Sequence, residues 1–178
     1  MIKVNSKRLL IMILVIGLCA PLIAISSTVL TVGLNEVASK SEFIFEGRVL
    51  SKETRPSPPD NRPFTYFTFE IIDVIKGSYP NKYIELGFAG GTINGLTMEV
   101  TDLQMPELKE KGIYFVESLS KELIHPLYGW NQGHYLVMNI SGAEKVVQAD
   151  MAATQSLSTA PTINEFKQNI RNILEGAQ

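Results

Sequence analysis

The chain has 178 residues, of which 45% are apolar and 19% charged, a composition typical of a globular protein with a packed core. Its formal net charge is −2, and without Lys3, Lys7 and Arg8 of the N-terminal segment 13 basic residues remain against 18 acidic ones. This mildly acidic balance argues against nucleic acid as a partner, because phosphate binding requires a basic face.

The N-terminus has the layout of a secretory signal peptide. The three basic residues just named precede an apolar stretch at 9–20, and Pro21 with the small residues at 24–26 provides a plausible cleavage site. We therefore expect residues 1–26 to be a signal peptide and the mature protein to begin near Ser27, in the periplasm or outside the cell.

An uncleaved membrane anchor is the alternative interpretation of the same segment. No charged residue occurs between positions 9 and 34, and residues 9–32 are long enough to span a bilayer. The only cysteine, Cys19, also lies here. A cleaved chain would therefore contain no thiol for a disulfide bond or for a cysteine-ligated metal site.

A short helix, a strand and a loop are predicted next along the chain. Residues 33–40 place Leu34 and Val37 on one helical face, which predicts a short helix or turn. Residues 41–50 contain regularly placed apolar side chains and are predicted to be a strand. Residues 51–63 include four prolines, and we expect them to form an exposed hairpin loop.

The stretch 64–77 is predicted to be the central strand. Phe67 and Phe69 share one parity, which then changes, so that Ile72 and Val74 are expected to continue the apolar face. A parity change within a strand indicates a β-bulge or a sharp bend, and long bent strands turn the corners of small closed barrels. We therefore expect these four side chains to lie in the core.

Four shorter strands and a second helix are predicted downstream. The strands are expected at 82–88, 96–100, 113–117 and 133–140, with glycine-containing turn signals between them. Thr162 and Glu165 have the spacing of a capping box at the start of a helix over 162–174. Its apolar stripe is expected to pack on the strands and consists of Ile163, Phe166, Ile170, Ile173 and Leu174.

This order of elements favours a mainly β fold. We expect a small OB-like barrel of five to six antiparallel strands with a short N-terminal and a longer C-terminal helix, and a β-sandwich is the alternative. After the signal peptide, the barrel with its leading helix is expected at 27–141. Residues 142–178 are expected to be a linker and the C-terminal helix, which packs on the barrel.

The sequence contains no motif for catalysis or for cofactor binding. It has no Gly-x-Ser-x-Gly elbow, its two histidines, His125 and His134, lack metal-ligand spacing, and its glycine-rich segment precedes a strand rather than a helix. We therefore expect a non-catalytic protein without cofactor or metal, and an enzyme with a dispersed active site is the alternative.

One segment, 128–135, contains residues typical of a binding site. It combines the only tryptophan with tyrosines, amides and a histidine, which together suit contacts to sugars or proteins. The candidate partner-binding residues are Tyr128, Trp130, Asn131, Gln132 and His134. Alternatively, the tryptophan plugs one end of the barrel. The expected partner is another exported protein or a cell-envelope component, with membrane contact only if the N-terminal segment is uncleaved.

Four segments carry a resemblance to known proteins: 41–53 (SEFIFEGRVLSKE), 66–77 (YFTFEIIDVIKG), 111–117 (KGIYFVE) and 129–137 (GWNQGHYLV). Together they resemble a group of small exported bacterial proteins of no settled activity. Over residues 41–137 the order of elements is also similar to the netrin-like N-terminal domain of tissue inhibitors of metalloproteinases, an OB-type barrel. The resemblance implies an inhibitor or accessory protein of a secreted metallopeptidase as a further hypothesis. Those inhibitors chelate the protease zinc through an N-terminal cysteine held by disulfides. The mature chain would lack any cysteine, so that mechanism cannot be transferred.

Overall fold

The computed structural model describes residues 32–152 and 157–177. The signal peptide, its cleavage and most of the proposed anchor lie outside these residues and stay predictions. Within the described ranges, no helix has the length and apolarity needed to cross a membrane. The fold of the described residues is mainly β, as the sequence predicts.

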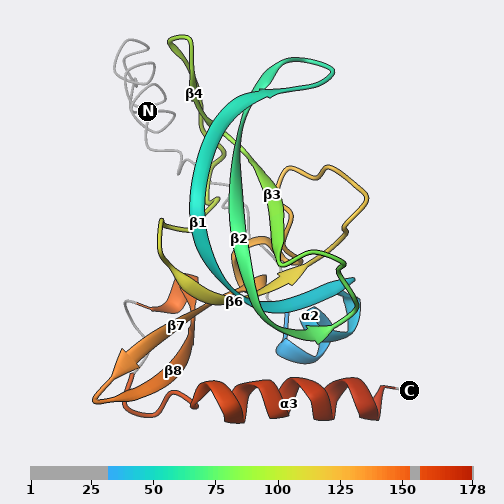
Figure 1. Cartoon of the computed structure of the whole chain (residues 1–178), viewed down its shortest axis with the longest axis vertical. Helices are drawn as coiled ribbons and strands as arrows, with labels where there is room; N and C mark the ends of the chain where they lie inside the picture. The colour runs from blue at the N-terminus through green and yellow to red at the C-terminus, as the bar shows by residue number, and fades with distance from the viewer. Residues whose placement is uncertain (1–31, 153–156, 178) are drawn as a thin grey trace, which may run out of the picture. The chain divides into compact units, whose positions relative to one another are not determined.

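Six strands form one antiparallel sheet in the order β3-β2-β1-β6-β7-β8 (Figure 1). Their bounds are Phe43–Ser57 for β1, Arg62–Lys76 for β2, Tyr83–Ala89 for β3, Lys111–Val116 for β6, His134–Ile140 for β7 and Ala143–Gln148 for β8. The remaining two strands, β4 (Gly91–Ile93) and β5 (Leu96–Met98), form a separate hairpin. No pairing between the end strands β3 and β8 is present among the described residues, so the predicted barrel is not closed by hydrogen bonds.

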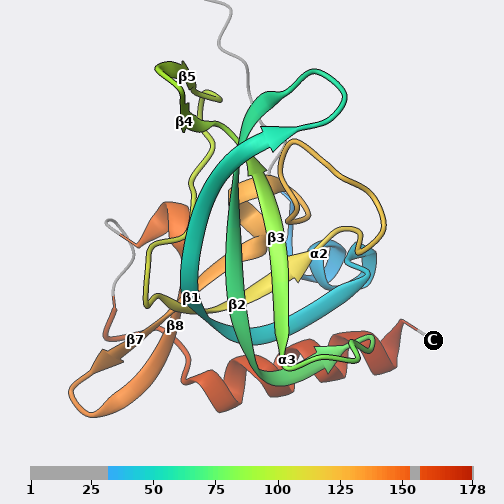
Figure 2. The ribbon, with the colours of Figure 1, turned by 45° about the horizontal axis from the view of Figure 1, so that its top comes forward.

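The parity change predicted in the central strand is a bulge in β2. Asp73 pairs with Glu46 and Ile71 pairs with Gly47, so the register shifts by one residue and Ile72 has no partner on β1. Two further register shifts occur along the same pair of strands. Bulges increase the local bend and twist of a strand, and Figure 2 shows β1 and β2 as a long curved ribbon.

The burial predicted for this strand is correct before the bulge and wrong after it. Phe67 and Phe69 are buried, whereas Ile72 is 45% and Val74 is 38% exposed. The reason is that β3 pairs with β2 only as far as Glu70, so the rest of β2 has a strand on one side alone. An apolar alternation continues there, in which Ile71 packs against the first core cluster and Ile75 against the second, while Ile72 and Val74 stay exposed.

The first strand is longer than the sequence predicts. Residues 51–57, expected in a hairpin loop, continue β1 and pair with β2 as far as Ser57 opposite Arg62. The pairing of β6 with β1 ends at Arg48, so this part of β1 has an open edge on that side. Proline is tolerated on edge strands because its missing N–H leaves no bond unmade there. The proline content therefore does not end the strand.

Apolar residues pack on both faces of the sheet. On the inner side of the curved strands lies a first cluster: Phe43, Phe45, Val49, Phe67, Phe69, Ile84, Leu86, Phe88, Tyr114, Val116 and Leu127. The second cluster lies against the helices α2 (Leu34–Lys40) and α3 (Ile163–Gly176): Val37, Ala38, Ile44, Ile113, Phe115, Val146, Ile163, Phe166 and Ile170. Successive residues of β1 and β6 thus alternate between two cores, which makes these the central strands of the fold.

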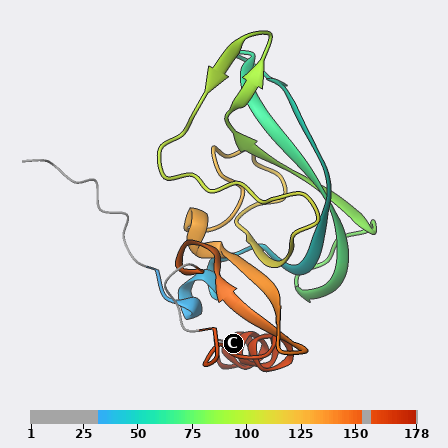
Figure 3. The ribbon, with the colours of Figure 1, turned by 90° about the vertical axis from the view of Figure 1, so that its left-hand side faces the viewer.

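The C-terminal helix forms and packs as the sequence predicts. Thr162 accepts a hydrogen bond from the Glu165 N–H while the Glu165 carboxylate accepts one from the Thr162 N–H, a complete capping box. Three residues of the apolar stripe are buried, and Ile173 and Leu174 pack at the border of the second cluster. Figure 3 shows α3 end-on beneath the strands.

Strand β8 was not anticipated from the sequence. Its six residues lie in the segment expected to be a linker, yet Val146 and Val147 are buried. An isolated bridge between Lys145 and Thr162 also brings β8 beside the start of α3. A single pair of valines between polar residues is too short an apolar pattern to predict a strand.

We expect truncation of Phe69 to alanine to lower the free energy of unfolding by about 3–5 kcal/mol, because it leaves a cavity in the first cluster. Ile72→Ala, on the same strand, should cost only about 0.5 kcal/mol because the side chain is largely exposed. Urea denaturation of both variants measures the difference. Equal costs would contradict this division of the strand.

Candidate functional site

The segment with site-like composition forms a tight turn that leads into β7. A 3-10 helix spans Trp130–Gly133, preceded by Gly129 at φ 63°, and Trp130 itself has φ 58°. Glycine adopts this left-handed conformation without steric cost, whereas tryptophan does so rarely. The turn places neighbouring side chains in different directions, so each candidate residue has its own surroundings.

The two amides bind other parts of the same chain. Asn131 Nδ2 donates to the carbonyl of Asp102 at 2.6 Å, and its Oδ1 accepts from the Gln104 N–H at 2.9 Å. Gln132 is buried, and its Oε1 accepts from the Val32 N–H at 2.6 Å. These side chains therefore hold the loop around residues 102–104 and the chain that enters α2.

His134 is part of a buried polar group. Its Nε2 donates to Glu110 Oε1 at 2.7 Å, and the Tyr114 hydroxyl donates to the same oxygen at 2.9 Å. Burial, together with the charge of Glu110, raises the pKa of Tyr114 well above its usual value. His134 is 1% exposed. It therefore stabilises the join between β6, β7 and the preceding loop rather than presenting a ring to solvent.

Trp130 has the most exposed side chain among the five candidates, with 36% of its surface exposed. Its ring stacks on His125, with centroids 6.0 Å apart and planes 6° from parallel. His125 also meets Phe88 edge to face at 4.9 Å. Tyr128 donates from its hydroxyl to Glu36 on α2 at 3.1 Å. Trp130 thus covers a buried histidine with one face and remains partly open to a partner.

The five candidates therefore do not form one convergent site. Asn131, Gln132 and His134 use their polar groups in bonds to other parts of the chain, and Trp130 alone combines a large side chain with substantial exposure. The partner-binding role predicted for the set stays a prediction. The structure contains a concave surface elsewhere, to which Asn131 contributes by fixing a loop.

That surface is a groove beside the upper part of the β1–β2 ribbon, with a volume of about 690 Å³. One wall is formed by Lys52 and Thr54 of β1 with Thr65 of β2, and the other by the loop 105–108. A second hollow of about 400 Å³ adjoins it at Gly91 and continues towards the β4–β5 hairpin. The sequence offered no motif for this groove, because its walls are about 50 residues apart in the chain.

Hydrogen bonds fix the polar wall that the ribbon contributes to the groove. Thr54 and Thr65 share a hydrogen bond between their hydroxyls at 2.9 Å, and the Thr65 hydroxyl donates to the Gly90 carbonyl at 2.9 Å. A Cβ at Gly91, which has φ 117°, would lie only 2.5 Å from the Thr65 hydroxyl. Glycine is therefore required there. At the rim, Leu108 is 49% exposed, so apolar surface lies beside this ordered polar wall.

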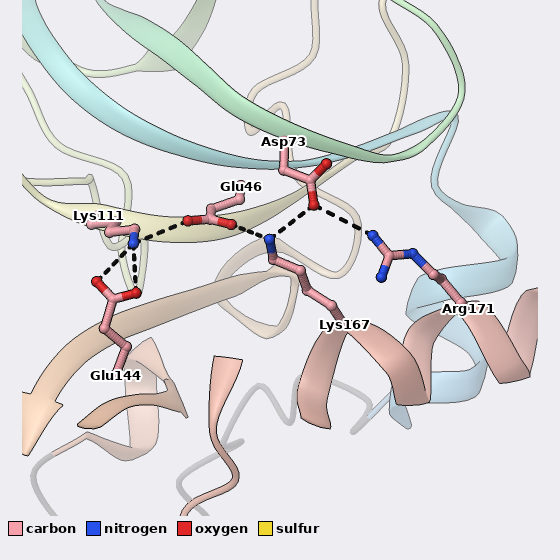
Figure 4. A network of polar contacts seen from close by, with 6 residues as sticks. All are labelled: Glu46, Asp73, Lys111, Glu144, Lys167 and Arg171. Carbon is pink, nitrogen blue, oxygen red and sulfur yellow. Dashed lines mark hydrogen bonds and ion pairs between the residues drawn. The ribbon is translucent and has the colours of Figure 1, made fainter. Parts of the chain in front are cut away.

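A network of alternating charges lies between the sheet and α3 (Figure 4). It runs Glu144–Lys111–Glu46–Lys167–Asp73–Arg171, with Lys111 2.7 Å from Glu144 and 3.0 Å from Glu46, and Lys167 2.8 Å from Asp73. Burial by itself would lower the pKa of Lys167, but hydrogen bonds to Asp73 and Glu46 raise it above its usual value. Every charge has an opposite neighbour, so the network ties α3 to β1 and β2.

Titratable groups of the described residues are not gathered into a metal centre. No group of three or more histidine, cysteine, aspartate or glutamate side chains in the ranges 32–152 and 157–177 is placed to hold a metal ion. Comparisons of the chain with protein-family models, with curated proteins and with solved structures found no match. The site is therefore interpreted from its geometry.

We expect His125 to make stability depend on pH. Burial, with a smaller contribution from the charge of His134, lowers the pKa of His125 from 6.5 to about 4. Between these values the unfolded chain binds the proton more readily, so this contribution is present above pH 6.5 and lost as the pH falls to 4. The loss should be about 3 kcal/mol, measured by urea denaturation across this range.

The matched variant is His125→Asn, whose side-chain oxygen can still accept from the Leu127 N–H as His125 Nδ1 does. Subtracting its pH profile from that of the wild type removes the contribution of the carboxylates. Parallel profiles between pH 4 and 6.5 would show that His125 does not resist protonation.

We expect Lys167→Ala to lower the free energy of unfolding by about 3–5 kcal/mol, since it leaves the buried Glu46 and its neighbour Asp73 without their shared cation. The exposed Asn169→Ala on the same helix is the control and should change stability by no more than about 0.5 kcal/mol. Denaturation midpoints of the two variants give the comparison. Similar midpoints would mean that α3 is held by its apolar stripe alone.

Proposed function

We propose that this protein is an exported, non-catalytic binding module, which receives part of another exported protein or of a cell-envelope component in the groove between the β1–β2 ribbon and the loop 105–108. The observation that carries the proposal is the groove itself, a fixed concave surface of about 690 Å³ with two threonines in one wall and an exposed leucine at its rim. Such mixed concave surfaces are the usual form of recognition sites.

The walls of the groove are preorganised for binding. The ribbon is a long antiparallel pair, and Lys109 N–H donates to the Val49 carbonyl at 3.0 Å, which ties the opposite loop to β1. Asn131 anchors the preceding part of that loop through its two hydrogen bonds. A partner therefore meets walls that are already ordered, which reduces the entropy lost on association.

The non-catalytic part of the proposal is supported by how the titratable groups are used. His134 and Tyr114 both bind Glu110 inside the protein, and the charges under α3 neutralise each other. The charged side chains that line the groove are Lys52 on the ribbon and Glu107 on the opposite loop, and neither histidine nor cysteine is among its lining residues. Binding by shape and hydrogen bonds suits this lining better than bond-making chemistry.

An OB-like, netrin-like arrangement is the finer description of the fold that we propose. Read in the order β6-β1-β2-β3, the sheet follows the Greek-key rule: three strands joined in sequence and a fourth that returns beside the first. OB-folds are partly open Greek-key barrels, which agrees with the strong curvature of β1 and β2. Export is proposed from the signal-like sequence of residues 1–26.

The proposal is tested by Leu108→Asp, which puts a charge at the rim of the groove. When the tagged protein is purified from the exported fraction, one partner should co-purify with it at a constant molar ratio. The Leu108→Asp variant should retain about tenfold less of this partner. Met138→Asp, at an exposed position of β7, is the control and should retain the partner fully. Undiminished recovery with Leu108→Asp, at unchanged melting temperature, would exclude the groove as the binding surface.

A further inference from the structure

The outer edge of β3 is an unpaired sheet edge with a defined set of backbone groups. β3 is the last strand on its side of the sheet, so only β2 pairs with it. Ile71 N–H donates to the Lys82 carbonyl and Gly90 N–H to the Pro63 carbonyl, which places the bonds to β2 on even-numbered positions of β3. The odd-numbered residues therefore direct their N–H and C=O groups outward: Tyr83, Glu85 and Gly87.

These outward groups have no hydrogen-bond partner among the described residues. Ala89, the next residue of the same series, does have one, because its N–H donates to the Ile124 carbonyl at 2.9 Å. The loop that follows β6 thus already pairs with the end of this edge. From that contact back to the start of β3, the edge is open at Tyr83, Glu85 and Gly87. This length is enough for a short added strand.

A hollow of about 220 Å³ lies between the open edge and the same loop. Residues 84–87 of β3 form one wall and residues 118–123 the other, with Tyr66 and Pro126 at its borders. Figures 1 and 2 show this loop running beside β3 on its free side. A strand added to a sheet lies about 4.8 Å from its neighbour, so a single peptide strand is the element that this edge can accept.

The charges around the hollow indicate the chemistry of the peptide. Glu85 is bound by the Arg55 guanidinium, with Nη1 3.0 Å from Oε2, and Glu122 accepts a hydrogen bond from the Ser57 hydroxyl. Lys121 lines the hollow and forms no ion pair or hydrogen bond with any described residue. Both carboxylates are thus held by contacts within the chain, whereas the Lys121 ammonium can meet a ligand without breaking a contact, and it favours an acidic side chain.

We propose that the open edge of β3 binds an extended acidic segment of a partner protein, which adds a strand beside β3 and places a carboxylate at Lys121. This surface is separate from the groove of the proposed function and does not depend on it. A second copy of the chain is the alternative occupant of this edge, and the dependence of edge protection on protein concentration distinguishes it.

The experiment uses the purified full-length protein and synthetic peptides of seven residues that alternate valine and threonine around a central aspartate, lysine or proline. Hydrogen exchange is measured at the amides of Tyr83, Glu85 and Gly87. The aspartate peptide should slow exchange at these amides by about tenfold or more, because they become strand-bonded. The lysine peptide should protect them less, and the proline peptide should not protect them.

Two variants at one position separate edge pairing from other binding. Glu85→Pro removes an outward N–H without removing a bond to β2, and should reduce affinity for the aspartate peptide by about tenfold. Glu85→Ala loses the same carboxylate, and with it the partner of Arg55, but keeps the N–H, so it should bind at least as well as the wild type and is the reference for the proline variant. Lys121→Glu should reverse the preference, so that the lysine peptide binds better than the aspartate peptide, and this result does not depend on how well the proline variant folds.

Three outcomes would overturn the proposal. One is unchanged exchange at the three amides with the aspartate peptide, and another is binding that survives Glu85→Pro in a folded protein. The third is protection of the amides that grows with protein concentration in the absence of peptide, which would assign the edge to a second copy of the chain.

Discussion

The structure depends on the burial of β1 on both faces over its first residues. Phe43 and Phe45 pack into one cluster and Ile44 into the other, and β6 repeats this alternation beside it. A strand that is buried on both faces must be packed against other elements on each face. The sheet provides this packing on one face by curving over its inner side, and the helices α2 and α3 provide it on the other. The two cores therefore share their central strands, and a change in one reaches the other through the same backbone.

Glu46 determines the position at which α3 packs on the sheet. It continues the helix-facing side of β1 and is 3% exposed, so its charge must be compensated within the protein. Lys167 of α3 and Lys111 of β6 supply that compensation, and Asp73 extends it to the bulged part of β2. An apolar stripe alone allows a helix to shift along a sheet. Fixed ion pairs select one position, and here the apolar contacts and the charge pairs agree on it.

Unequal strand lengths produce the groove and the open sheet edge. β1 runs beyond the end of its pairing with β6, and the groove lies along that extension. β3 has a strand on one side only, and the hollow at its free edge lies between backbone and loop. In both places the sheet leaves polar groups next to an ordered loop. These groups are directional and already in place, which is why we propose both surfaces as binding sites.

Much of the local structure could be predicted from the sequence. The alternation around Phe67 and Phe69 identified the central strand and its bulge, and the spacing of Thr162 and Glu165 identified the cap of α3. These features arise from contacts within a few residues of the chain. The signal-like N-terminus is also a property of the sequence, and it remains a prediction from sequence alone.

Tertiary structure decided the burial of each strand and the geometry of the candidate site. The same alternation that buries Phe69 leaves Ile72 exposed, because β3 ends before it can cover the rest of β2. Asn131 was a candidate for partner binding, but its amide holds the loop at Asp102, a contact 29 positions away along the chain. Local pattern reports which side chains prefer burial or hydrogen bonds. Which of them obtain these contacts depends on where distant segments meet, and only the folded chain determines that.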